Sequence, residues 1–167
     1  MNLIFSGKLR KKTLKINEIE TLSLNPYWLS NIICHFIEGY GNHAPFELIY
    51  LAAPLILRGE SRDALCKLNK TSTIYSAFLD DKDKRKKITA LQYYVEVYKE
   101  FVNPAFIVYA NQGNNFGLKI TNNSVYDYKK ERDKTTKNYL KAAHNLGVVF
   151  SKEKKQDCFF KLGVFKV

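Results

Sequence analysis

The chain has few of the residues that build metal sites and disulfide frameworks. Only three cysteines and three histidines occur among its 167 residues. Cys34, Cys66 and Cys158 are far apart, and no C-x-x-C pair is present. A zinc knuckle needs closely spaced pairs, and a disulfide framework usually has an even number of cysteines. We therefore expect neither, and this cysteine usage fits a reducing, cytoplasmic compartment.

Motifs of catalytic sites are also missing. The chain has no G-x-x-x-x-G-K-[ST] phosphate loop and no G-x-S-x-G elbow. Neighbouring Cys34 and His35 would point about 100° apart on a helix, so we expect packing rather than a thiolate–imidazole pair. Several carboxylates lack the D-x-D or E-x-K spacing of nucleases: Glu38, Glu47, Glu60 and Asp63. We expect a protein that is not an enzyme and that needs no cofactor or metal.

Long apolar runs are absent too. The longest one, Leu48 to Leu57, is about half of the roughly 20 residues that span a bilayer. The apolar run near Met1 is too short for a secretory signal. We expect a soluble intracellular protein with no membrane partner.

The chain does have an excess of basic charge. It carries 27 Lys and Arg against 16 Asp and Glu, for a net charge of +11. From Tyr128 onward there are 11 basic and 4 acidic residues, so most of the excess lies at the end of the chain. Such a charge favours nucleic acid, an anionic membrane surface or an acidic protein as partner. A second basic run, residues 82–87, alternates with aspartates and is typical of a self-neutralising helix start.

Residues 25–103 are predicted to be helical, after a basic arm formed by residues 1–24. Asn25-Pro26 is typical of a helix start, and Gly39 and Gly41 indicate its end. Pro45 is expected to open an apolar helix from Phe46 to Leu57, which Pro54 should kink. Further helices are predicted over residues 61–68, capped by Ser61, over residues 71–79, capped by Thr71 or Ser72, and over residues 84–102, ended by Asn103-Pro104. Residues 105–110 fit a helix or a strand equally well.

Residues 104–167 are predicted to form a winged-helix-like unit. Asn122-Asn123 favours a hairpin turn between residues 116–120 and 125–128. A helix over residues 131–146 should end at Gly147, and strands 148–150 and 158–164 would form the β-hairpin wing around a charged turn. The predicted fold class is therefore mainly α (α+β), with a helical N-terminal part and a C-terminal winged-helix-like unit in one compact body.

Lysines of this unit form a candidate DNA-binding surface. On a helical wheel the side chains of four lysines fall within about 60° of one another: Lys130, Lys134, Lys137 and Lys141. The turn of the predicted wing adds three more: Lys152, Lys154 and Lys155. Lysine suits phosphates, whereas base reading usually uses Arg, Asn or Gln. We expect contact with the backbone of double-stranded DNA without sequence preference; the alternative is a solvated helix face.

Aromatic residues on the predicted helices are candidates for a protein interface. Tyr93 and Tyr94 together cover more of the helix circumference than one buried face needs. The predicted interface set is Trp28, Phe36, Tyr40, Tyr93 and Tyr94. The alternative is that most of these side chains belong to the core.

Several short motifs, in this order, resemble a known family. They are Asn25-Pro26, residues 36–40 (FIEGY), residues 51–57 (LAAPLIL), residues 61–65 (SRDAL), Thr71-Ser72, residues 141–147 (KAAHNLG) and residues 162–164 (LGV). Over residues 25–165 the chain is similar to the middle component of three-component ABC-ATPase systems, a group that includes the small subunit of Lamassu-type anti-phage defence. In that family Leu-Gly-Val continues into Arg-Pro, whereas this chain has Phe165-Lys166.

The resemblance implies an adaptor without catalysis of its own. Such a subunit would bind the head or neck of an ATPase similar to structural-maintenance-of-chromosomes (SMC) proteins and link it to an effector, often a nuclease. The alternative function is a free-standing winged-helix DNA-binding regulator, and a small nuclease is a weaker third hypothesis. A regulator should offer Arg, Asn and Gln to the bases, so the dominance of lysine argues against it.

Overall fold

The described part of the chain is a bundle of helices. The computed structural model describes residues 24–114, 117, 119–121 and 126–167. The predicted basic arm lies outside these residues, apart from Leu24. The elements are α2 (Pro26–Tyr40), β1 (Ala44–Pro45), α3 (Glu47–Leu57), α4 (Gly59–Leu65), the π-helix η1 (Tyr75–Leu79), α5 (Lys82–Lys87), α6 (Leu91–Asn111), β2 (Lys119–Ile120), the 3₁₀ helix η2 (Tyr128–Lys130), α7 (Lys134–Phe150) and α8 (Lys155–Lys161).

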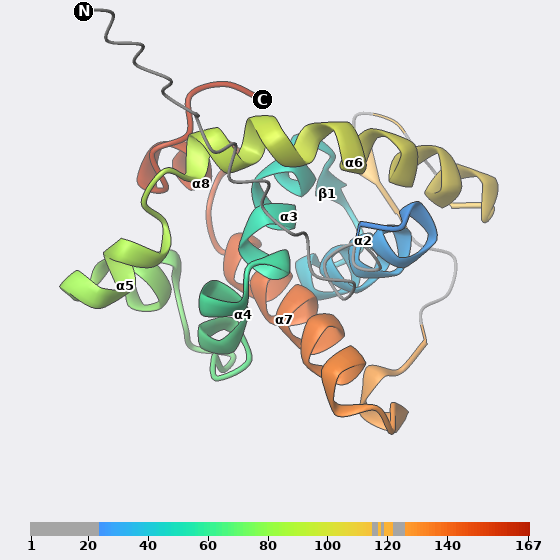
Figure 1. Cartoon of the computed structure of the whole chain (residues 1–167), viewed down its shortest axis with the longest axis horizontal. Helices are drawn as coiled ribbons and strands as arrows, with labels where there is room; N and C mark the ends of the chain where they lie inside the picture. The colour runs from blue at the N-terminus through green and yellow to red at the C-terminus, as the bar shows by residue number, and fades with distance from the viewer. Residues whose placement is uncertain (1–23, 115–116, 118, 122–125) are drawn as a thin grey trace, which may run out of the picture.

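Helix α2 packs against both α6 and α7 (Figure 1). Its start is as predicted, because the Asn25 side chain accepts a hydrogen bond from the Tyr27 N–H at 2.9 Å. Gly41 ends the helix as predicted: its φ is 102° and its N–H bonds back to Ile37 and Glu38. Gly39, the other predicted stop, lies inside the helix. Helix α3 is almost entirely buried and continues past Pro54 to Leu57.

The predicted wing is wrong, because residues 148–150 and 158–161 are helical. Gly147 does not end α7, which continues to Phe150. It lies where α7 crosses α2, and a Cβ at this position would lie only 2.1 Å from the Phe36 carbonyl oxygen. The glycine therefore allows two helix backbones to touch. Cys158 lies in α8, and its side chain is buried in the core. Leu162, the residue after this helix, is buried there too, so no β-hairpin forms here.

The predicted helix over residues 84–102 is divided in two and extended. Helix α5 ends at Lys87, and α6 begins at Leu91 after Ala90, whose φ is 61°. Asn103-Pro104 does not end α6, which runs on to Asn111. Pro104 lies on the exposed side of the helix, so its missing N–H removes one hydrogen bond without disturbing the core. The buried positions on both sides of it keep the helical period: Val95, Val102, Ala105, Phe106 and Tyr109.

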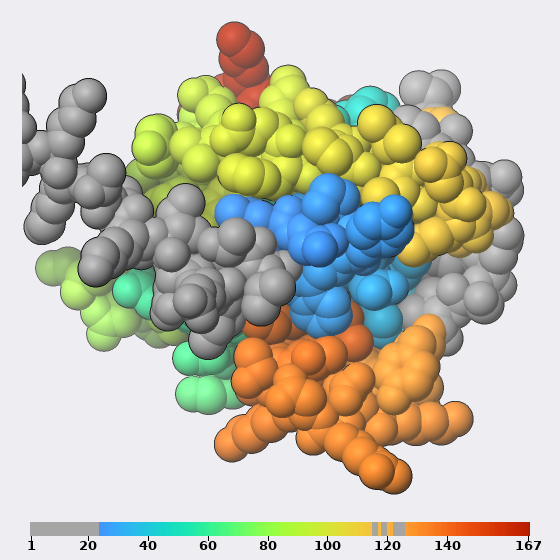
Figure 2. Space-filling view, turned by 45° about the vertical axis from the view of Figure 1, so that its right-hand side comes forward, coloured from blue at the N-terminus to red at the C-terminus, as the bar shows by residue number. Residues whose placement is uncertain are grey.

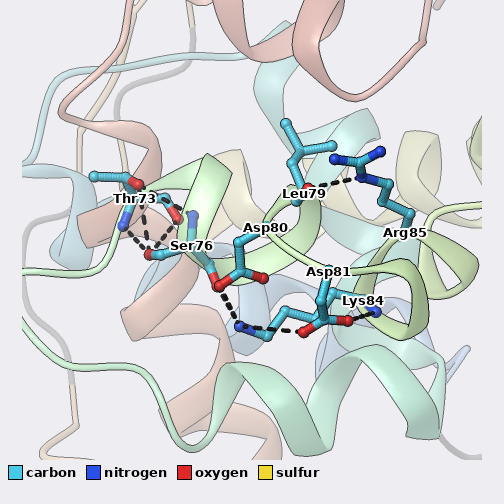
Figure 3. Close-up of polar contacts among 7 residues, drawn as sticks. All are labelled: Thr73, Ser76, Leu79, Asp80, Asp81, Lys84 and Arg85. Atoms are coloured by element: carbon cyan, nitrogen blue, oxygen red, sulfur yellow. Dashed lines mark hydrogen bonds and ion pairs between the residues drawn. The ribbon is translucent and has the colours of Figure 1, made fainter.

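The segment from η1 to α5 is held by local polar contacts (Figure 3). Neither Thr71 nor Ser72 caps η1. Just before it, the Ser76 N–H donates to Thr73 Oγ1, and the Thr73 N–H donates to Ser76 Oγ. Lys84 Nζ lies 2.8 Å from Asp80 Oδ2 and 3.9 Å from Asp81 Oδ2, so this basic run is partly neutralised from within, as predicted. Likewise Ser61 does not cap α4; it lies inside that helix.

The described residues include two short strands, which pair with each other. Lys119–Ile120 pairs antiparallel with Ala44–Pro45. The predicted turn at Asn122-Asn123 lies outside the described residues.

The predicted boundary between the helical part and the winged-helix-like part, at residues 103 and 104, falls inside α6. Helices from both sides of it share one hydrophobic core. None of the described helices is long and apolar enough to cross a membrane.

Candidate functional site

Four of the predicted DNA-binding lysines lie in the first half of α7 or just before it. Lys130 ends η2 and Lys134 opens α7, and both are exposed. Lys137 and Lys141 are half-buried, and Lys137 Nζ donates to the carbonyl of Lys129 at 3.0 Å. Figure 2 shows this end of α7, in orange, standing out at the bottom of the molecule. Of these four lysines, Lys130 and Lys134 therefore face solvent most fully.

The second lysine group follows the other end of α7: Lys152, Lys154 and Lys155. Lys152 Nζ donates to the carbonyl of Lys70 and, at 2.6 Å, to that of Ser72. Lys155 Nζ lies 2.6 Å from Glu47 Oε1. Lys134 and the turn that holds Lys152 lie at opposite ends of α7, roughly 25 Å apart at 1.5 Å per residue. Two of these three lysines thus hold the turn to neighbouring segments, and the two groups do not form the single surface that a wing would have made.

The predicted interface aromatics are in different environments. Phe36 is only 1% exposed and packs edge-on against Phe150, so it belongs to the core and is not accessible to a partner in this structure. Trp28 is half-buried with its ring edge-on to that of Tyr139, and Tyr40 is half-buried beside Phe36. Aromatic pairing within the fold accounts for these three.

Tyr93 and Tyr94 lie near the start of α6 and do reach the surface. Tyr93 is 62% exposed, with its ring 5.5 Å from that of Tyr94. Tyr94 is half-buried under the Arg58 guanidinium, which lies 4.1 Å from its ring centroid. This cation–π contact fixes Tyr94 and leaves Tyr93 as the side chain on the outside.

Further exposed apolar residues lie close to the start of α6. The tail after α8 returns to this helix, because the N–H groups of Phe165 and Lys166 both donate to Gln92 Oε1. We call four side chains the α6–tail surface, given with their exposed fractions: Tyr93 (62%), Val97 (37%), Phe160 (77%) and Phe165 (83%). Sequence reasoning missed Phe160 because it placed this residue in a wing strand, and it named Phe165 only as a departure from the family's Arg-Pro ending; Gly163, a turn residue between the two, could have identified them.

A cluster of titratable groups lies between α2, η2 and α7. His144 Nδ1 is 3.7 Å from Glu38 Oε2, and the His144 ring lies 5.5 Å from that of Tyr128. Burial lowers the pKa of His144; the neighbouring His35 and Lys129 lower it further, and Glu38 opposes them. Both ring nitrogens of His35 lie 2.8 Å from backbone carbonyl oxygens, those of Asn31 and Tyr126. His35 therefore has a packing role, and it is not paired with the adjacent thiol.

The described residues offer no metal centre. No three His, Cys, Asp or Glu side chains among them gather so that they could hold an ion. An open groove of about 390 Å³ lies beside α6, lined by Tyr50, Asn103, Phe106, Ile107, Ala110 and Asn111. The Tyr50 hydroxyl donates to Asn103 Oδ1 at 2.7 Å within this groove. Its lining holds no titratable pair suited to acid–base chemistry.

Comparison with known proteins places the chain in a family. Residues 13–166 match the model of the ABC-three component (ABC-3C) system Middle Component 3. No curated protein and no solved structure matches the chain. Because the matched region covers nearly the whole chain, this protein belongs to the family of Middle Component 3 of ABC-three component systems.

Proposed function

We propose that this protein is a non-catalytic adaptor that joins the ATPase of its three-component system to an effector subunit. Family membership makes it an accessory component of a multi-subunit system with protein partners. The observation that supports an adaptor most directly is the α6–tail surface, where three aromatic side chains are more than 60% exposed. Exposed apolar groups gathered in one region are typical of surfaces that another protein covers.

The resemblance supplies the finer part of the proposal. The ATPase would be a long coiled-coil protein similar to SMC proteins, and this subunit would bind its head or neck. The effector would be a nuclease, and the system would act against phages or plasmids. These assignments rest on the similarity of the motifs in residues 25–165 to the middle component of such systems.

A contact with the backbone of DNA is the second part of the proposal. Exposed Lys130 and Lys134 stand at the projecting end of α7 and support it. They suit phosphates rather than base edges, so the contact would be independent of sequence. The regulator hypothesis, by contrast, loses its structural basis because the wing is absent from the described residues.

The test is reconstitution of the complex from its purified subunits. The full chain, the ATPase and the effector encoded beside it would be mixed singly and in pairs, and complexes followed by size-exclusion chromatography with light scattering. An adaptor should co-elute with each of the other two and should be required for them to co-elute. An ATPase–effector complex that assembles equally well without this chain would contradict the proposal. Sequence-specific duplex binding by the chain alone would revive the regulator.

A further inference from the structure

Two exposed tyrosines lie close to the lysines at the projecting end of α7. Tyr27, in the first turn of α2, is 69% exposed, and Tyr126, just before η2, is 53% exposed. Lys129, Lys130 and Lys134 are exposed as well. Figure 2 shows the start of α2, in blue, next to the end of α7, in orange, on one face of the molecule. We call these five side chains the tyrosine–lysine surface.

Contacts with α2 and α7 fix the backbone on which these side chains stand. The Tyr126 carbonyl oxygen lies 2.8 Å from His35 Nε2 of α2. The Lys129 carbonyl accepts a hydrogen bond from Lys137 Nζ of α7 at 3.0 Å. The residue after Tyr27 packs its ring edge-on against a tyrosine of α7. Side chains on an ordered backbone lose less conformational entropy on binding than side chains on a loose segment.

The carboxylates of this region are bound to groups of the protein itself. Asp127 Oδ1 accepts a hydrogen bond from the N–H two residues on, and Asp133 Oδ2 accepts one from the N–H three residues on. Glu131 Oε1 accepts from the N–H groups of the next two residues. Glu38, about three turns after Tyr27 on α2, lies 3.7 Å from a ring nitrogen of a histidine of α7. Residues 126–137 still carry five Lys and Arg against three Asp and Glu, so the region is basic.

Lysines beside exposed aromatic rings are typical of surfaces that bind single-stranded nucleic acid. The ammonium groups contact phosphates, and the rings stack on unpaired bases, each of which commonly strengthens binding roughly five-fold to a hundred-fold. In a duplex the faces of the bases are stacked on one another, so only the lysines would find a partner there. An acidic peptide would pair with the lysines, but it seldom offers a flat ring beside each negative charge, as every nucleotide does. The two tyrosines therefore favour an unpaired strand.

We propose that the tyrosine–lysine surface binds single-stranded DNA, with the rings of Tyr27 and Tyr126 stacked on bases and the lysines at the phosphates. This inference rests on the DNA contact in the proposed function and specifies the form of DNA that is bound. Tyr27 and His35, which contacts the Tyr126 carbonyl, are about 12 Å apart along α2, so a few nucleotides reach both rings. Every base has a face on which a ring can stack, so binding is independent of sequence.

The experiment measures binding of the full chain to labelled oligonucleotides by fluorescence anisotropy, at one salt concentration. The ligands are a single-stranded oligothymidylate and a duplex of the same length. The parent protein should bind the single strand roughly ten-fold more tightly than the duplex, because stacking adds to the phosphate contacts that both share.

Variants of the two tyrosines separate stacking from charge. Tyr27→Ala with Tyr126→Ala should weaken single-strand binding roughly thirty-fold or more and duplex binding less than about two-fold. Tyr27→Phe with Tyr126→Phe should bind like the parent, since stacking uses the ring and not the hydroxyl. Tyr75→Ala with Tyr93→Ala is the matched control, because these two tyrosines are 57% and 62% exposed on other elements. Circular dichroism melting verifies that each variant keeps the fold.

The outcomes separate this inference from the DNA contact on which it rests. If single strand and duplex bind equally well and the Tyr27 and Tyr126 alanine variant loses neither, the stacking is wrong while the DNA contact stands. An equal loss in the control variant also overturns it. Tyrosine-dependent binding that is tighter for a ribo-oligonucleotide assigns the surface to RNA, and tighter binding of polyglutamate assigns it to an acidic protein; both overturn it. A parent protein that binds no DNA, alone or in the reconstituted complex, overturns the DNA contact too and leaves the adaptor role.

Discussion

Gly39 of α2 and Gly147 of α7 lie against each other's helix at the crossing of the two. A Cβ built on Gly39 would lie 2.0 Å from the His144 carbonyl oxygen, and one built on Gly147 would lie 2.1 Å from that of Phe36. Both distances are far below van der Waals contact, and the obstructing atoms are backbone atoms in regular helices. The two helices therefore touch directly through their backbones, and any side chain at either position would separate them.

The first prediction is that Gly147→Ala destabilises the fold. Alanine favours a helix over glycine by up to about 1 kcal/mol, but overpacking at this crossing should cost more, for a net loss of about 2 kcal/mol. In a chain of this size that corresponds to a fall in Tm of roughly 4–8 °C. Thermal unfolding followed by circular dichroism measures it.

The control for this substitution is Gly59→Ala at the start of α4. A Cβ there would meet only the end of the Arg62 side chain, at 3.7 Å. This variant should be as stable as the parent or slightly more stable. If Gly147→Ala were equally harmless, the close crossing of α2 and α7 would be wrong.

A second prediction concerns the proline inside α6. Pro104→Ala restores an N–H at an exposed helical position, so it should raise stability by about 1–2 kcal/mol, less than the full interior cost of proline because proline also restricts the unfolded chain. Chemical denaturation in urea measures the change. Pro26→Ala is the matched control, because Pro26 is the first residue of α2, where no N–H is needed. An equal gain in both variants would show that the position within the helix does not matter.

Third, the three thiols should react with an aromatic disulfide reagent in a definite order. Burial raises the pKa of Cys34 to about 11 and that of Cys158 to about 12, and both side chains are buried. Cys66 is half-buried, with a pKa raised mainly by burial. At neutral pH Cys66 should therefore be modified first, and the other two only after unfolding. Mass spectrometry of native and urea-treated samples identifies the sites, and early modification of Cys158 would contradict the packing of α8.

The fourth prediction concerns the dependence of stability on pH. Burial is the main cause of the lowered pKa of His144, and His35 and Lys129 add to it against Glu38. Between the folded value and the ordinary value of 6.5, the unfolded chain binds more protons than the folded protein, so stability rises with pH in that window. The stability that neutral His144 contributes is therefore lost as the pH falls from about 6.5 toward the pKa of His144 in the folded protein.

Urea titrations at a series of pH values from about 7.5 to 5 would measure this effect. In His144→Gln the loss of stability on acidification should be smaller than in the parent, because the group that gains its proton on unfolding is gone. His43→Gln, which removes an exposed histidine, is the matched control. A His144 variant with an acid dependence as steep as that of the parent would show that another group is responsible.

A fifth prediction distinguishes the two lysine groups. If the assembled complex binds duplex DNA through the projecting end of α7, Lys130→Ala with Lys134→Ala should weaken binding for all sequences and lower the slope of log affinity against log salt by about two. Lys152→Ala with Lys155→Ala should change the slope little, because these ammonium groups bind Lys70, Ser72 and Glu47 within the protein. Fluorescence anisotropy at several salt concentrations measures both. An effect of the second pair alone would place the DNA contact at the other end of α7.

Some parts of the fold were predictable because they depend on nearby residues. The start of α2 is one, since an asparagine followed by proline satisfies the first backbone N–H groups within a single turn. The internal neutralisation of residues 80–87 is another, because the partners are three or four residues apart. Ends of helices that rely on distant contacts were mispredicted. Gly147 has the residue type of a helix stop, yet here it serves a contact with α2, more than a hundred residues earlier.

The candidate surfaces were also predictable only in the parts that depend on nearby residues. Residue types and spacing alone indicate a mainly helical, basic chain and its family, with lysines on one side of a helix and surplus aromatics near Tyr93. Long-range contacts were needed to show that Phe36 is core, that Lys152 and Lys155 hold segments of the protein together, and that Gln92 brings Phe165 to the start of α6. The physical reason is range: capping and helical period act within a few residues, whereas burial and salt bridges depend on which distant segments meet when the chain folds.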